Sequence, residues 1–531
     1  MPSALADAAI NSIFEDAKRN IWFATGRGLV RYADGTFTRL TLSSDPDENT
    51  ILEVHQDREG SLWLSTGKGI ARYANGSFEK FQGSDGLSDD AVQRMLLDAE
   101  GNIWVSTFGG GLDRFRDEKF VTYSSKVGLS YDNVNTVMGD RTGTMVVGTT
   151  FGGVNLIKDG KVTVIDARKG LPSSEVGALA EDREGRIWIG TRRGVVTYQN
   201  GTVTPRFTMQ DNEPYPLGNA ILARSSGEVL VASNNAVLSY RNGRYSPLVT
   251  PEPVRSFNSH ITHLFEARDG TLWISTRSML YWYKDGTLTR VSGREGFPER
   301  WYMAFYQDPE GTIWLGVADV GLIRYKDGKA RSISVEQGLF DYVAYVVLED
   351  SSGYLWMSSN KGVYRVRKSE LDDVADGKAA RVTSVAYGRS DGMETFETNG
   401  GTWPSGWRFQ DGRLAFCTLK GVAVVNPADI RINQVPPPVV IDRFVVEGER
   451  KDIRKHLAIP PGASRFEFHY AGISFAGAKD VRYKYQLVGI DEDWIDAGSR
   501  RSAYYTHLDP GTYTFRVKAA NSDGIWNEEG A

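Results

Sequence analysis

A repeat of about 42 residues constrains this chain more than any other feature of its sequence. Segments such as DREGSLWLSTGKGIARY and DREGRIWIGTRRGVVTY align without gaps. We count ten copies, nine of them spaced by 41 to 43 residues and the last by 60. One position marks each copy, and it is held by Trp22, Trp63, Trp104, Val146, Trp188, Leu230, Trp273, Trp314, Trp356 and Phe416. Such self-similarity has to be interpreted before any local motif, because each copy is one structural unit.

Each copy contains the pattern of four short strands. An alternating apolar run comes first, as at 91–97, and a tight turn follows in which Asp98 caps backbone amides and Gly101 takes a positive φ. Asp lies six residues before the marker position in seven copies, and Gly lies three before it in eight. The second strand carries Ile-Trp, and further turns lead to a third and a fourth strand. Four strands in one such copy predict a β-propeller blade, with the Trp as a core residue between neighbouring blades.

Composition supports an all-β fold and excludes several classes of function. The 57 glycines and the 11% aromatic content favour tight turns between short strands. The net charge of −5, with acids and bases interleaved, argues against nucleic-acid binding through a basic field. The single cysteine, Cys417, excludes a disulfide framework and a thiolate metal site. We expect no cofactor and no metal, and we find no secretory signal at the start and no membrane-spanning run.

The pattern changes after the three prolines at 436–438. Residues 439–531 alternate as in the strands of an immunoglobulin-like β-sandwich. This segment is also rich in tyrosine, at Tyr483, Tyr485, Tyr504, Tyr505 and Tyr513.

Both parts resemble known families. The pattern V-x-x-[IL]-x-x-D-x-x-G-x-[IL]-W-[IVL]-[GS]-T-x-x-G-[ILV] resembles the two-component regulator propeller repeat over residues 10 to 428. Gly-Leu pairs such as Gly170-Leu171 match the lead-in of that repeat, and residues 390–401 are similar to the last blade of the family. The tyrosine-rich segment looks like the triple-tyrosine (Y_Y_Y) domain, which follows these propellers in hybrid and classical histidine kinases and in related sensors.

The resemblance implies two seven-bladed rings, the sandwich, one membrane span and a cytoplasmic output domain. Seven copies, counted back from Phe416, reach Val146. We therefore expect the last three blades of a truncated first ring at 1–126 and a complete seven-bladed propeller at 127–430. A Pro-rich linker at 431–438 and the sandwich at 439–531 would follow. The alternative is that all ten blades form one unusually wide or open assembly.

A ligand is expected on the face where the loops joining second to third strands and the loops joining blades come together. Aromatic faces beside Arg and Asn side chains suit sugars, and guanidinium groups can pair bidentately with carboxylate or sulfate. We therefore predict recognition of an oligosaccharide, in particular an acidic one. The candidate ligand-binding residues are Arg192, His260, Arg277, Arg300, Trp301, Tyr302, Tyr342, Asn360 and Lys361. The alternative is that these are solvated loop residues.

Two other groups of residues favour structural roles. His260 and His263 could suggest a metal, but on a strand their side chains face opposite ways. Asp391, Glu394 and Glu397 could be arranged like the carboxylates of a glycosidase. The resemblance explains them instead as features of the degenerate last blade.

The leading prediction is the extracytoplasmic sensor region of a periplasm-facing, membrane-anchored bacterial signalling protein. It would bind an oligosaccharide or another small molecule, contact no nucleic acid, and work as a homodimer in the full-length protein. It would reach the membrane only through a segment outside this sequence. The alternatives are a propeller enzyme acting on glycans, such as a lyase or sialidase, and a cell-surface or secretion scaffold. We expect no enzymatic activity, because the sequence offers no convincing catalytic set.

Overall fold

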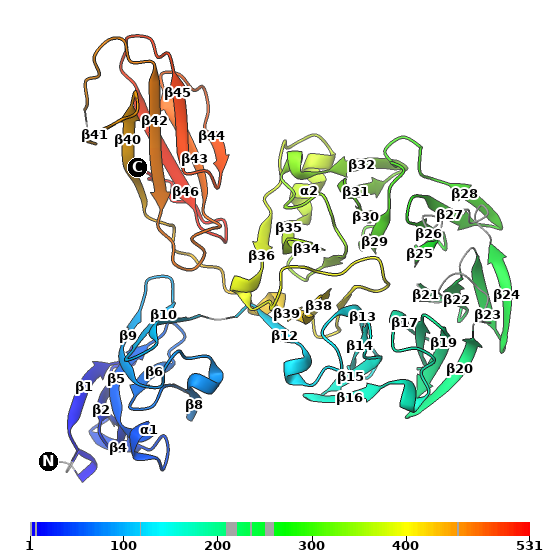
Figure 1. The fold of residues 1–531 in the computed structure, drawn as a ribbon, viewed down its shortest axis with the longest axis horizontal. Helices are drawn as coiled ribbons and strands as arrows, with labels where there is room; N and C mark the ends of the chain where they lie inside the picture. The colour runs from blue at the N-terminus through cyan, green and yellow to red at the C-terminus, as the bar shows by residue number, and fades with distance from the viewer. Residues whose placement is uncertain are drawn as a thin grey trace. The chain divides into compact units, whose positions relative to one another are not determined.

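The structure is a computed structural model that describes residues 3–5, 8–116, 118–208, 220–233, 236–249, 260–453 and 456–531. It is built almost entirely of antiparallel strands, which confirms the all-β class (Figure 1). The chain divides into two compact units, one formed by Met1–Asp117 with Ile432–Ala531 and the other by Glu118–Arg431. No helix among the described residues is long and apolar enough to cross a membrane.

The unit Glu118–Arg431, called the ring below, contains seven four-stranded sheets in its described residues. The first strands of successive blades pack side by side, and β13 packs against β37 and β38, which closes a seven-bladed propeller. The first six blades are β13–β16 (Val134–Gly139, Met145–Thr149, Val154–Lys158, Lys161–Ile165), β17–β20 (Val176–Glu181, Ile187–Thr191, Gly194–Gln199, Thr202–Thr208), β21–β24 (Ile221–Ala223, Val229–Ala232, Val237–Arg241, Arg244–Val249), β25–β28 (Ile261–Glu266, Leu272–Thr276, Leu280–Lys284, Thr287–Arg290), β29–β32 (Tyr302–Gln307, Ile313–Val317, Gly321–Lys326, Lys329–Ile333) and β33–β36 (Val347–Glu349, Tyr354–Ser359, Gly362–Arg367, Val385–Tyr387).

The seventh blade takes its strands from both ends of the ring. It contains β37 (Gly406–Arg408), β38 (Leu414–Thr418), β39 (Gly421–Val425) and, as its outer strand, β12 (Phe120–Tyr123). In this pairing Phe120 lies opposite Val425 and Tyr123 opposite Val422. The ring therefore begins earlier than the predicted boundary at residue 127, because β12 pairs with the last blade and not with the blades that precede it.

The Asp and the Trp of the repeat recur together because the Asp carboxylate accepts a hydrogen bond from the Trp indole. Asp182 accepts hydrogen bonds from the turn amides of Glu184 and Arg186 at 3.1 and 2.9 Å and from the Trp188 indole at 2.6 Å. Each carboxylate thus ties the turn to the second strand of its blade. Six copies share this Trp-to-Asp bond, at 2.6 to 3.0 Å: Asp16–Trp22, Asp57–Trp63, Asp98–Trp104, Asp182–Trp188, Asp308–Trp314 and Asp350–Trp356.

In the last copy, the residue at the Trp position is one place earlier in the sequence than predicted. The turn before β38 is closed by bonds from Phe409 N to Arg413 O and from Gly412 N to Phe409 O, as in the turns of the other blades. The register of β37 with β38 then puts Ala415 at the Trp position. The assignment to Phe416 is wrong because Phe409 replaces the Asp that would have fixed the alignment.

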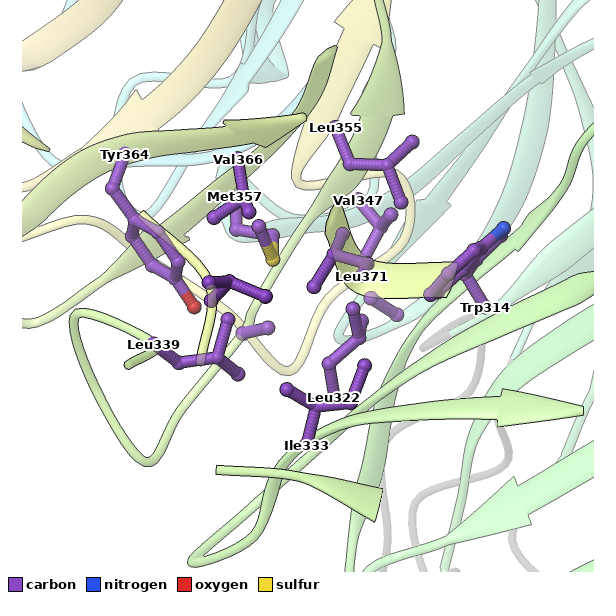
Figure 2. Packing of buried hydrophobic residues seen from close by; sticks show 13 residues of the cluster. Trp314, Leu322, Ile333, Leu339, Val347, Leu355, Met357, Tyr364, Val366 and Leu371 are labelled. Carbon is purple, nitrogen blue, oxygen red and sulfur yellow. The ribbon is translucent and has the colours of Figure 1, made fainter. Parts of the chain in front are cut away.

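The core of the ring lies between neighbouring blades. In the fifth and sixth blades, Trp314, Leu322 and Ile333 pack against Leu355 and Tyr364 (Figure 2). Helix α2 (Lys368–Ala375), inserted between β35 and β36, adds Leu371 to this cluster. The buried Arg324 anchors the helix through Asp372 at 2.7 Å.

Short 3-10 turns precede several blades and explain the Gly-Leu lead-in. After Ala167–Lys169 the chain turns at Gly170 with φ +97°, a conformation that favours glycine, and Leu171 is then buried. The other 3-10 turns among the described residues are Ser3–Leu5, Gly83–Asp85, Ser125–Val127, Val335–Gln337, Arg389–Asp391 and Pro427–Asp429.

The other unit begins with three blades. They are β1–β4 (Ile10–Glu15, Ile21–Thr25, Gly28–Ala33, Thr36–Leu40), β5–β8 (Ile51–Gln56, Leu62–Thr66, Ile70–Ala74, Ser77–Phe81) and β9–β11 (Val92–Leu97, Ile103–Thr107, Gly111–Phe115). A one-turn helix α1 (Pro46–Asn49) joins the first blade to the second. The third blade is a three-stranded sheet in the described part of the chain.

The C-terminal part of this unit consists of two antiparallel sheets that share one core. Their orders are β41-β40-β42-β45 and β44-β43-β46. The core is rich in tyrosine, with Tyr470, Tyr483 and Tyr485 buried beside Val517. Two sheets on one core agree with a sandwich, and its likeness to immunoglobulins stays a prediction. The strands are β40 (Val439–Val446), β41 (Glu449–Lys451), β42 (Arg465–Gly472), β43 (Arg482–Val488), β44 (Ile495–Gly498), β45 (Ser502–Thr506) and β46 (Thr514–Ala520).

Candidate functional site

The ring has two different ends. Its loop face carries the connections between blades and the loops between second and third strands. Its turn face carries the tight turns between first and second strands and between third and fourth strands. All but one of the candidate ligand-binding residues fall in loops of the loop face, and Tyr302 lies at the start of β29.

Residues 398–405, called the channel segment below, run across the centre of the ring (Figure 1, yellow). The Trp403 carbonyl accepts from Leu179 N of the second blade at 3.3 Å, and the Pro404 carbonyl accepts from Val137 N of the first blade at 3.0 Å. The Trp403 ring packs against His263 of the fourth blade and Phe305 of the fifth, with ring centroids 5.5 and 6.5 Å apart. Because one segment contacts four blades, it forms a floor beneath the loop face.

An arginine and a tryptophan form the most ordered part of the loop face. The Arg277 guanidinium lies over the Trp301 ring, 4.5 Å from its centroid. The Trp301 indole donates to Thr262 Oγ1 at 3.0 Å, which fixes the ring plane. Gly401 of the channel segment passes directly below: a Cβ there would lie 2.6 Å from the Trp301 ring. Trp301 is therefore held from both sides, and it presents a rigid surface for Arg277.

The two histidines lie beneath this pair and are not arranged as metal ligands. Both are buried, and His263 Nδ1 lies 2.9 Å from Thr262 Oγ1. Burial, together with the positive charge of Arg277, lowers the pKa of His263 to about 3 and also lowers the pKa of His260. Both imidazoles are therefore neutral near pH 7, and the described residues hold no cluster of three metal-binding side chains.

A second part of the loop face comes from the sixth blade. Asn360 hydrogen-bonds the Tyr345 hydroxyl, and Tyr345 in turn packs on Gly400 of the channel segment. Lys361 Nζ lies 3.5 Å from Asp341 Oδ1. Asn360 and Lys361 are both exposed, so a ligand can reach their side chains.

The remaining predicted residues are spread along the rim. Arg192 is exposed and lies 3.3 Å from Glu175. Arg300 is exposed and donates to the Glu299 carbonyl at 3.0 Å. The exposed Tyr342 donates its hydroxyl to Glu336 at 3.0 Å. The structure does not bring these three together with Arg277.

Tyr302 is a core residue. It is 0% exposed and donates its hydroxyl to the Pro298 carbonyl at 2.8 Å. It follows Trp301 directly at the start of β29, and successive strand residues face opposite ways. Direct ligand contact by Tyr302 is therefore incompatible with its burial.

Two of the three carboxylates at 391–397 form ion pairs where the ring closes. Asp391 lies 3.6 Å from Lys119, and Glu394 lies 3.1 Å from Lys126. Both pairs join the last blade to the segment around β12. These contacts give Asp391 and Glu394 a structural role.

Sequence reasoning missed Tyr345, Thr262 and Trp403. The extra residues before the last copy were the available signal, because an insertion in a closed ring has to go either outward or into the centre. A long insertion that contains Gly400, Gly401 and Trp403 suits a path between closely packed blades.

Comparisons with known proteins agree with the two modules. The family model described as "Two component regulator propeller" matches residues 86–109, 170–193 and 256–278, and the "Y_Y_Y domain" model matches residues 474–531. The chain therefore carries propeller repeats of the two-component regulator type followed by a Y_Y_Y domain, as in the sensor region of histidine kinases.

A curated relative and two solved structures are similar to this chain. Histidine kinase P4 of Formosa agariphila is 26% identical over an alignment of 223 residues, which covers 39% of this chain and 15% of the kinase. The extracellular domain of the putative hybrid two component system BT3049 from B. thetaiotaomicron shares the fold, with a TM-score of 0.74 at 22% identity. That match covers 99% of this chain and 72% of the other. The corresponding domain of BT4673 from the same organism has a TM-score of 0.48 at 15% identity, with 99% and 75% covered.

Proposed function

We propose that this chain, with its two-component regulator propeller repeats and its Y_Y_Y domain, is the ligand-binding sensor region of a signal-transduction protein. The relative that it matches in sequence is a histidine kinase, and the structure that it resembles is the extracellular domain of a hybrid two-component system. We place the region on the extracytoplasmic side of the membrane and expect the full-length protein to signal as a homodimer.

The proposed ligand is an oligosaccharide with a carboxylate or sulfate group, bound on the loop face of the ring. The Arg277 guanidinium stacked on Trp301 is the observation that carries this proposal. Trp301 fixes the plane of the guanidinium, whose edge can form two parallel hydrogen bonds to an anionic group of a sugar. The polar side chains of Asn360 and Lys361 supply further contacts on the same face.

The loop face is built for binding with little rearrangement. The channel segment contacts blades on several sides of the ring, and its glycines hold Trp301 and Tyr345 in place. A preorganised site loses less conformational freedom when a ligand binds. A ligand can then bias an output domain only through a difference in its affinity for two states of the receptor.

A panel of neutral, uronate-containing and sulfated oligosaccharides, followed by calorimetry on each hit, tests the proposal. Arg277→Ala and Trp301→Ala should each weaken an acidic hit about 10- to 100-fold, the range expected for loss of a charge-assisted hydrogen bond or an aromatic contact. Arg244→Ala is the matched control, because Arg244 is an exposed arginine beside a turn of the opposite face.

Two outcomes would change the proposal in different ways. Equal affinity in Arg277→Ala, Trp301→Ala and the control would move the site away from this part of the ring. Tight binding of another metabolite, with no binding of any glycan, would overturn the sugar assignment and leave the sensor assignment standing.

A further inference from the structure

A pocket in the ring is lined by the inner strands of the fifth, sixth and seventh blades and by the end of the channel segment. Its volume is about 230 Å³, and its lining includes Phe305, Tyr306, Tyr345, Trp403, Trp407 and Arg408. The inner strands of all blades run from the loop face to the turn face. The lining runs from positions 403–405 of the channel segment along β29 and the whole of β37 to Arg408, so the pocket extends toward the turn-face end of the central channel.

The seam between the sixth and seventh blades lacks a contact that three other seams of the ring make. In three blades the last residue of the inner strand reaches back and accepts a hydrogen bond from a turn amide of the preceding blade. The pairs are Arg141 N to Glu181 at 2.8 Å, Ser225 N to Glu266 at 3.2 Å and Arg268 N to Gln307 at 2.8 Å. The last residue of the seventh inner strand is Arg408, and a guanidinium has no acceptor. The link therefore cannot form there.

Arg408 has no counter-ion among the residues that the structure describes. It is exposed, it lines the pocket, and it makes no hydrogen bond or ion pair with any residue that the structure describes. The nearby acidic group Glu349 is already engaged, because it accepts from the Tyr306 hydroxyl at 2.6 Å and lies 2.9 Å from Lys368 Nζ. The positive charge of Arg408 is thus available to an anion from solution.

The apolar wall of the pocket favours an apolar group beside the anion. Five of its side chains are aromatic, and Val346, Val347 and Leu348 add apolar surface. An engineered apolar cavity of about 150 Å³ binds benzene. A volume of about 230 Å³ therefore accommodates one aromatic ring with a short substituent.

From these observations we propose that the turn-face pocket binds a small aromatic carboxylate. The ring of the ligand packs against Phe305, Tyr345 and Trp403, and its carboxylate pairs with Arg408. The pocket contains none of the residues proposed to contact the oligosaccharide, and its wall residue Tyr345 is hydrogen-bonded to Asn360 of that site. Trp403 belongs to the wall of the pocket and also contacts His263 beneath the loop face, so both sites rest on the channel segment.

Phenylacetate is a suitable probe, and phenylacetamide is its neutral counterpart of almost the same shape. Binding is followed on the full chain by calorimetry and by quenching of tryptophan fluorescence, since Trp403 and Trp407 line the pocket. We expect phenylacetate to bind at least about tenfold more tightly than phenylacetamide, which corresponds to one hydrogen bond to a charged group.

Arg408→Gln should reduce phenylacetate affinity about tenfold or more and leave phenylacetamide affinity unchanged. Arg413→Gln is the control, because Arg413 lies on the adjoining turn outside the pocket and already pairs with Asp411 at 2.8 Å. Equal phenylacetate affinity in wild type and Arg408→Gln overturns the proposal. Equal affinity for the acid and the amide, or no binding of either, overturns it as well.

Discussion

The ring and the three-blade segment at residues 10–115 use the same repeat but bury it differently. The Trp-to-Asp hydrogen bond forms in all three N-terminal blades and in three blades of the ring. Yet Leu112 of the third blade is 64% exposed, whereas Leu322 at the same strand position in the fifth blade of the ring is 0% exposed. The motif therefore determines the local fold of a blade, and the neighbouring blades determine how much of its apolar surface is buried.

This comparison predicts unequal effects for one substitution made at the two equivalent leucines. Leu322→Ala should lower the free energy of unfolding by about 3 kcal/mol, because it removes buried methyl groups and leaves a cavity. Leu112→Ala should change it by less than about 0.5 kcal/mol, as is usual for exposed positions. Denaturant unfolding, followed by hydrogen exchange of peptides from each blade, measures both. Equal losses would show that the third blade is buried in solution.

A second prediction concerns pH and separates the ring from the N-terminal blades. The unfolded chain protonates His263 near pH 6.5, whereas burial keeps it neutral in the ring down to about pH 3. The unfolded state therefore binds more protons below pH 6.5, so the stabilisation is present above that pH and is lost as pH falls. Between pH 6.5 and 5 the ring should lose about 2 kcal/mol, at 1.4 kcal/mol per pH unit.

Hydrogen exchange of peptides from the fourth and fifth blades measures this loss, with peptides from 92–115 as the reference. His263→Gln should flatten the dependence, because the side chain cannot titrate. The groups that face His263 are Thr262, Trp301, Phe305, Trp403 and Arg277, and none of them is acidic. An unchanged slope in the variant would rule His263 out as its source.

The smallest expected effect is a gain in stability. Trp273 Nε1 is buried with no hydrogen-bond partner among the described residues, because Ala267 stands where other copies have Asp. The turn itself is the usual one, with Ala267 N donating to Thr271 O at 2.9 Å. Ala267→Asp should therefore stabilise the ring by about 1 kcal/mol, the worth of a typical hydrogen bond. Ala267→Asn offers a neutral acceptor at the same place, and thermal unfolding compares the two. Destabilisation by both would show that the site has no room for the side chain.

The features that the sequence predicted are those that repeat. The blade pattern predicted the number of blades in each unit, because every copy carries its own turn and its own core positions. The tyrosine-rich segment likewise predicted a separate C-terminal module.

The sequence did not predict the structural features that occur only once in the chain. The outer strand of the last blade, Phe120–Tyr123, has four residues and no motif, and its partner lies about three hundred positions away. The register of Ala415 was missed because Phe409 interrupts the pattern. The pairing of Arg277 with Trp301 joins two blades and depends on Gly401, so no local spacing could reveal it.

The closure of the ring has a mechanical consequence. Phe120, near the entry of the chain into the ring, lies opposite Val425, near its exit. A pull on the chain outside both ends would therefore act on the same end of the β12–β39 pair. This force would break the hydrogen bonds of the β12–β39 pair one after another. It would not load all of them at the same time in shear. The seam between the two ends is thus where tension would first open the propeller.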